Sequence, residues 1–145
     1  AAATLAARDL APTVGWDEYA GASAQLDRLD AALGPPDALV LTPYLRAPDG
    51  RYGVPLRIRY GRDALPVGPL DAEPLASWLV AEAARRPVRV LAPYGRLAAL
   101  PPGLAAVEEA RVVLDLPQWE QREDEIPRHG ARLVLPLAVV RLVPA

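Results

Sequence analysis

The sequence predicts an α/β domain (an α+β arrangement), with a mixed sheet of about five strands. This sheet contains one antiparallel hairpin, and two main helices and one short helix pack on it. Two segments repeat apolar residues at helical spacing, and several short Leu- and Val-rich runs bounded by Pro or Gly are typical of strands. The two kinds of segment alternate along 145 residues with no repeat and no linker. We therefore expect a single globular domain spanning residues 1–145.

The first helix is predicted over residues 16–33. Its apolar residues recur four, three and four positions apart, at Ala22, Leu26, Leu29 and Leu33. Gly34 and the prolines that follow it end the helix. The Ala-rich residues 1–15 predict only a short strand or a frayed helical turn, or a poorly ordered segment.

Residues 37–61 predict a β-hairpin. Two runs rich in Leu, Val, Ile and Tyr flank Ala47-Pro48-Asp49-Gly50, which has the residue types of a bulged hairpin turn. Pairing across this turn leaves one face nearly all apolar and places Arg57 and Arg59 on the other face. The first strand is then a central one, and the second an edge protected by its arginines.

A second helix is expected from Asp71 to Arg86, with a buried stripe of Leu75, Trp78, Leu79 and Ala83. A short strand (88–92), a brief helix (102–110) and a strand (111–116) then predict a parallel crossover unit. The strand 111–116 is apolar on both faces, which is typical of the interior of a sheet. Residues 131–143 predict one long strand or two short ones, with an edge, bulge or corner at Pro136.

The composition excludes most familiar catalytic chemistry. The chain has no Cys, so it has no thiol nucleophile or cysteine metal site, and no Lys, so it has no P-loop or Schiff-base lysine. Ser23 and Ser77 fall inside predicted helices, and His129 is the single histidine. We assign no catalytic residue, no metal ligand and no cofactor, and an enzyme is the less expected outcome.

Composition also bears on the source and location of the protein. Met, Phe, Lys and Asn are absent and have A/T-rich codons, which indicates a bacterial genome of high G/C content. No apolar run reaches the length of a membrane helix, and no intact secretory signal is visible. We expect a cytoplasmic protein that does not associate with membranes.

The leading hypothesis for function is a non-catalytic binding or assembly module. Trp119 lies among charged residues, where an aromatic side chain either packs on its own domain or contacts a partner. Arg46, Arg51 and Trp119 are the residues we expect at such an interface. The expected partner is a second copy, because symmetric dimers are the commonest oligomers, or another protein.

Two alternatives stay open. From Asp37 to Arg62 there are five arginines against two aspartates, and arginine interleaved with tyrosine is typical of surfaces that bind nucleic acid. That hypothesis uses Arg46, Arg51, Tyr52, Arg57 and Arg59, against an overall charge of −2. The other alternative is a carboxylate-based enzyme, metal-assisted or not, around Asp115, Glu120 and His129. For that last group we favour a simpler explanation, in which Asp115 caps or hydrogen-bonds a neighbouring loop and the acidic run is a solvated surface.

Overall fold

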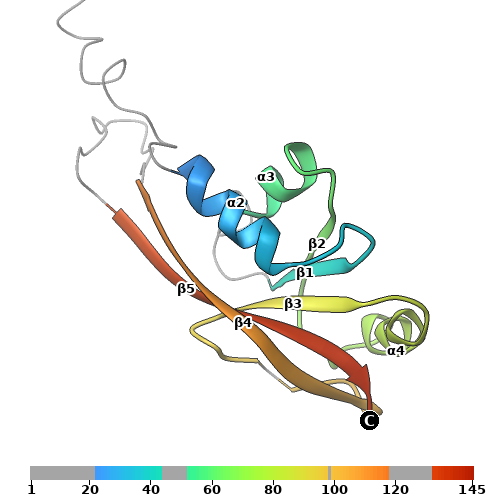
Figure 1. The fold of residues 1–145 in the computed structure, drawn as a ribbon. Coiled ribbons are helices and arrows are strands. Elements are labelled where there is room, and N and C mark those ends of the chain that lie inside the picture. The colour runs from blue at the N-terminus through green and yellow to red at the C-terminus, as the bar shows by residue number, and fades with distance from the viewer. Residues whose placement is uncertain (1–21, 44–51, 98, 118–131) are drawn as a thin grey trace, which may run out of the picture.

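The computed structural model describes residues 22–43, 52–97, 99–117 and 132–145 (Figure 1). In chain order the elements are α2 (Ala22–Ala32), β1 (Leu39–Pro43), α3 (Gly53–Ile58), β2 (Asp63–Val67), α4 (Leu75–Arg85), β3 (Val88–Pro93), β4 (Leu104–Pro117) and β5 (Arg132–Pro144).

The five strands form one sheet in the order β2-β1-β3-β5-β4. The first three are parallel, and β5 runs antiparallel to both β3 and β4. The predicted α/β fold with a mixed five-stranded sheet is therefore confirmed. Its antiparallel pairs are β3 with β5 and β5 with β4. Parallel crossovers join β1 to β2 through α3 and β2 to β3 through α4.

Helices cover both faces of the sheet. Leu26, Leu29 and Leu33 from α2 and its C-terminal end pack with Leu56 of α3 in one apolar cluster, as the spacing of the first helix predicts. Leu79 of α4 packs in a second cluster on the opposite face. Figure 1 shows α4 on its own at one end of the sheet, away from α2 and α3. The central strand β1 supplies both clusters, with Val40 to the first and Leu39 and Leu41 to the second.

The predicted hairpin over residues 37–61 is wrong. Its second half contains helix α3, and the strand beside β1 is the parallel strand β2. Tyr52 and Leu56, four residues apart, are fully buried, whereas Ile58 is 81% exposed. A helix buries two residues spaced by four on one face and turns Ile58 outward, while a strand places all three on the same face.

The parallel crossover predicted from residue 88 to residue 116 is also wrong. Residues 104–110, predicted as part of a short helix, form the first half of β4, which pairs with β5 along its whole length. The thirteen-residue strand β5 supplies a continuous ladder partner. Its pairing outweighs the local helix propensity of the alanines in this segment. The strand predicted to be interior therefore lies at the edge of the sheet.

Helix α4 lies where the second helix was predicted, but not every residue of its predicted buried stripe is buried. Ala76, Leu79 and Glu82 are buried, and Leu75 and Ala83 pack against the core. Trp78, predicted to be buried, is 38% exposed. None of the helices in the described ranges is long and apolar enough to span a membrane.

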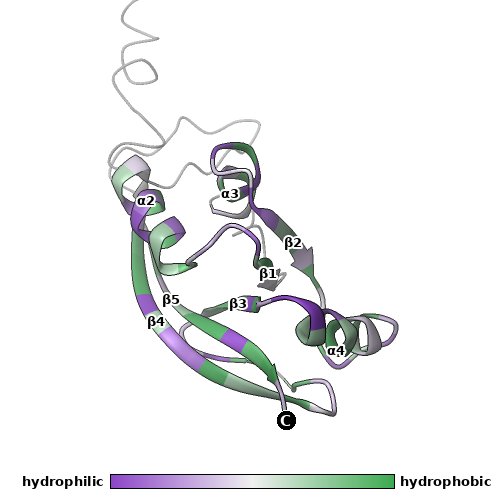
Figure 2. Ribbon diagram, turned by 45° about the vertical axis from the view of Figure 1, so that its right-hand side comes forward, coloured by the Kyte–Doolittle hydropathy of each residue, from purple (hydrophilic) through white to green (hydrophobic). Residues whose placement is uncertain are grey.

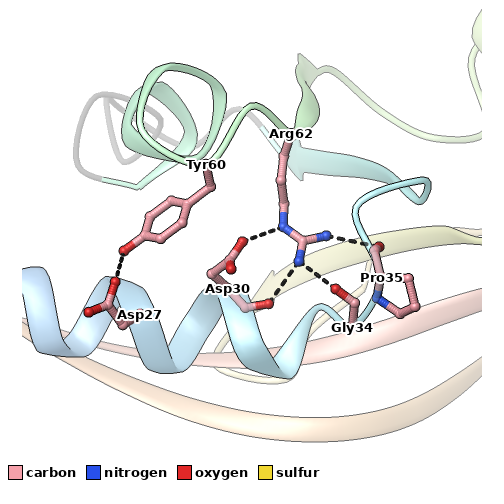
Figure 3. Close-up of polar contacts among 6 residues, drawn as sticks. All are labelled: Asp27, Asp30, Gly34, Pro35, Tyr60 and Arg62. Carbon is pink, nitrogen blue, oxygen red and sulfur yellow. Dashed lines mark hydrogen bonds and ion pairs between the residues drawn. The ribbon is translucent and has the colours of Figure 1, made fainter.

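One arginine ties α2 to the start of β2 (Figure 3). The Arg62 guanidinium donates through Nε to Asp30 Oδ1 at 2.6 Å. It also donates to the carbonyl oxygens of Asp30 (2.9 Å), Gly34 (2.6 Å) and Pro35 (3.2 Å). Its side chain is only 3% exposed. The carbonyls at the end of a helix lack partners within the helix, so Arg62 supplies donors that α2 itself does not have.

Tyr60 makes a second contact from the same segment to α2. Its hydroxyl donates a hydrogen bond to Asp27 Oδ1, and the Arg59 guanidinium lies 5.4 Å from the centre of its ring. Burial, and next the hydrogen bond to Asp27, raise the pKa of Tyr60 from its ordinary value of 10.0 to about 12. Folding therefore favours the protonated phenol.

We predict that Arg62→Ala lowers the free energy of unfolding by about 2–3 kcal/mol, because the Asp30 carboxylate and three carbonyl oxygens lose their hydrogen-bond donor. Urea denaturation measures this loss. The matched control is Arg59→Ala. Arg59 also contacts α2, but its side chain is 47% exposed, and we expect a loss below about 1 kcal/mol. Equal losses in the two variants would contradict the role given to Arg62.

A second prediction concerns alkaline pH. The stabilisation from Tyr60 is complete below pH 10 and is lost as pH rises towards 12, because the unfolded chain releases the phenolic proton first. The chain has no lysine, so tyrosines dominate titration in this window. The unfolding free energy of the natural protein should fall towards that of Tyr60→Phe between pH 10 and pH 12. If the unfolding free energies of the two proteins changed in parallel with pH, the ionisation of Tyr60 would not be coupled to folding.

Candidate interaction surface

The structure separates the residues predicted to bind nucleic acid or a partner. Tyr52 is fully buried beside α2, so its ring is not available for stacking on bases. Arg57 Nη1 donates to the Ala64 carbonyl at 3.1 Å, and Arg59 Nη1 donates to Ser23 Oγ at 2.8 Å. These two arginines therefore connect α3 to β2 and α2, instead of protecting a strand edge. Arg46, Arg51 and Trp119 lie outside the described residues.

Asp115, the centre of the carboxylate hypothesis, has an exposed side chain near the end of β4. Glu120 and His129 lie outside the described residues. Within the part of the chain that the structure describes, no three His, Asp or Glu side chains gather as metal ligands.

The backbone of Asp115 contacts α2. Its amide donates to Gln25 Oε1 at 2.6 Å, and its carbonyl accepts from Gln25 Nε2 at 2.8 Å. The Gln25 amide thus takes the place that a neighbouring strand would occupy. These bonds also establish that the N–H and C=O of Asp115 point away from β5. Because this direction alternates along a strand, the backbone groups of Val113 and Arg111 point to the same open side.

The outer edge of β4 is therefore the main unpaired edge of the sheet. Strand β4 is fourteen residues long, and among the described residues its ladder partner is β5 alone. The opposite edge strand, β2, is only five residues long and contains Pro66, which limits further pairing.

Valines stand half exposed on both faces of this edge. Val107 is 49% exposed and lies on the α2 face, opposite Arg141 of β5. Val113 is 53% exposed and lies on the α4 face, because its neighbour Leu114 packs into the cluster beneath α2. Val134 of β5 is also 53% exposed and shares the face of Val113. Figure 2 shows apolar residues along β4 and β5, interrupted by a hydrophilic stretch midway along β4.

That hydrophilic stretch surrounds a β-bulge between Glu108 and Ala110. The Arg111 guanidinium bonds both carboxylate oxygens of Glu108, with Nη2 at 3.1 Å from Oε2. The hydrogen bond from Arg111 holds the pKa of Glu108 below its ordinary value. The pair places one negative and one positive charge close together on the free edge.

We define the β4 surface as the outer edge of β4 from Leu104 to Val113, with Val107 and Val113 on its two faces. Sequence analysis recognised that part of this strand is apolar on both faces, but it missed the edge position. Local periodicity carries no information on how many neighbours a strand has. Comparisons of the chain with models of protein families, with curated proteins and with solved structures find no match.

We predict that Gln25→Ala speeds hydrogen exchange at the Asp115 amide and lowers the free energy of unfolding by about 1 kcal/mol, because both hydrogen bonds are lost. The Val113 amide is the internal control, since it faces the same edge without a contact to Gln25. Exchange measured by NMR should change at Asp115 and not at Val113. Unchanged exchange at Asp115 would contradict this role of Gln25.

Proposed function

We propose that this domain is a non-catalytic assembly module that pairs with a second copy of itself through the β4 surface. The observation that supports the proposal is an interior-type strand at an edge position. The strand has half-exposed valines on both faces, and no strand from the described parts of the chain lies beside its outward backbone groups from Leu104 to Val113. A further strand on this side covers both valines and completes the ladder.

The charges on β4 favour a second copy as the occupant. In an antiparallel pairing about a two-fold axis at the bulge, Glu108 of each copy faces Arg111 of the other. Opposite charges directly across a ladder stabilise it, so the same ion pair that forms within one copy extends into a ring of four charges. An isologous contact of this kind also closes after two copies and does not continue into a fibre.

The energetics indicate a weak dimer. Covering the remaining exposed part of a valine stabilises by about 1 kcal/mol, and each backbone hydrogen bond adds about 1 kcal/mol. Four valines and a few hydrogen bonds exceed the lower estimates of the association cost, about 4 kcal/mol, by only a few kcal/mol. A net stabilisation of about 4 kcal/mol corresponds to a dissociation constant of about 1 mM, so we expect the dimer to form only as the protein concentration approaches the millimolar range.

The test is the native mass by light scattering from low micromolar to millimolar concentrations. We predict that the mass of the natural protein rises towards that of a dimer, while Val113→Arg stays monomeric, because it places a second positive charge at the contact. Val80→Arg is the matched control, since Val80 is an exposed valine on α4. A natural protein that stays monomeric throughout, or a Val113→Arg variant that associates as well as it does, would overturn the proposal.

A further inference from the structure

Helix α2 reaches the outer edge of β4 beyond the bulge, at Asp115. Figure 1 shows α2 beside that end of β4. The Asp115 N–H donates to Gln25 Oε1 at 2.6 Å, and Gln25 Nε2 donates to the Asp115 carbonyl at 2.8 Å. These are the two backbone groups that Asp115 would otherwise offer to a neighbouring strand. Gln25 therefore limits the part of β4 with which a second copy can pair.

Only residues whose backbone groups point away from β5 can form hydrogen-bonded pairs with a second copy. Pro136 of β5 accepts a hydrogen bond from the N–H of Tyr94, the residue after β3, so the even-numbered residues of β5 point to β3. The residues of β4 that lie opposite even-numbered residues of β5 therefore point outward: Leu104, Ala106, Glu108, Arg111, Val113 and Asp115.

The pairing proposed above, with the two-fold axis at the bulge, uses these outward residues in a fixed register. It pairs the outward residues before the bulge with those beyond it: Glu108 with Arg111, Ala106 with Val113, and Leu104 with Asp115. Gln25 already occupies the backbone of Asp115, so this ladder ends at the pair that contains Val113. The remaining pairs form without breaking any contact of α2 that involves Gln25.

A competing register places the two-fold axis at Val113. The valines of the two copies then lie opposite each other, and Arg111 of each copy faces Asp115 of the other. Apolar contact and opposite charges across the ladder favour this register as well. It requires the N–H and C=O of Asp115 in both copies, so it breaks four hydrogen bonds made by Gln25. Their combined loss disfavours the register on the order of a hundredfold to a thousandfold.

We propose that Gln25 determines the register in which two copies of this domain pair, because it blocks the register centred on Val113 and leaves open the one centred on the bulge. This inference rests on the proposed pairing through the β4 surface. An edge strand with valines and charges on both sides of a bulge offers more than one self-complementary register. Occupying one residue of the edge from within the same copy leaves a single arrangement of the dimer.

Disulfide trapping tests this proposal, because the chain has no cysteine of its own and oxidation captures even a weakly populated dimer. In the competing register, the introduced thiols of two Val113→Cys copies lie opposite each other, within the distance that a disulfide spans. In the register centred on the bulge they lie about 20 Å apart along the edge, and Val113→Cys instead lies opposite Ala106→Cys. Mass spectrometry of an oxidised equimolar mixture of the two variants distinguishes the mixed disulfide from the Val113→Cys homodimer.

With Gln25 present, we predict that the mixed disulfide predominates over the Val113→Cys homodimer. Adding Gln25→Ala to both variants should raise the ratio of homodimer to mixed disulfide about tenfold or more. The matched control is Arg28→Ala, since Arg28 is exposed on α2 and makes no hydrogen bond or ion pair with the described residues. It should leave the ratio unchanged.

The outcomes separate this inference from the proposed function. If the mixed disulfide forms but Gln25→Ala leaves the ratio unchanged, or if the Val113→Cys homodimer already predominates with Gln25 present, Gln25 does not determine the register and the pairing of β4 still stands. If neither disulfide forms at millimolar protein concentration, the pairing through the β4 surface is itself wrong, and the role of Gln25 falls with it.

Discussion

The position of α2 depends on a single buried guanidinium. Helix α2 ends at Ala32, and the chain continues through Leu33 and Gly34 to two prolines, neither of which has an N–H to offer the last carbonyls of the helix. Arg62, immediately before β2, supplies those donors and pairs with Asp30. Unpaired carbonyls at a buried helix end cost several kcal/mol together. Arg62 therefore selects one placement of α2 over the sheet.

Two contacts of α2 with the sheet follow from that placement. Near its N-terminal end α2 directs Gln25 to the backbone of Asp115, and no other described residue outside β5 is hydrogen-bonded to the edge of β4 from Ala105 to Val113. At its C-terminal end Gly34, with φ of +69°, lies over the guanidinium of Arg89. A glycine is needed there because other residues rarely adopt this backbone conformation. One helix thus contacts both the edge of β4 and the guanidinium of Arg89.

The sequence predicted the elements correctly where the spacing of the apolar residues was typical of one kind of secondary structure. The stripe of α2 and the two-sided apolar character of β1 identified a helix and a central strand. It failed at α3 because a spacing of four, as between Tyr52 and Leu56, places two residues on one face of either a helix or a strand. It failed at the start of β4 because Ala-rich residues favour a helix until a long partner strand competes. Gln25 was not singled out, since only the placement of α2 brings it to the edge of β4.

Residues 111–116 were predicted to form an interior strand, but they belong to β4 at the edge of the sheet. This error has a different physical explanation from those at α3 and at the start of β4. The composition of a strand reflects every surface that it contacts, whether its own chain or another molecule supplies the contact. Residues 111–116 have the composition of an interior strand, yet β4 has a single neighbouring strand in the part of the chain that the structure describes. Bulges and charges commonly protect an edge strand. The bulge of β4 is flanked by Glu108 and Arg111, and in the pairing that we propose their opposite charges face those of a second copy. An edge that is protected only against pairing would need neither that complementarity nor two half-exposed valines. The sequence pattern and the topology agree when a second strand completes the sheet.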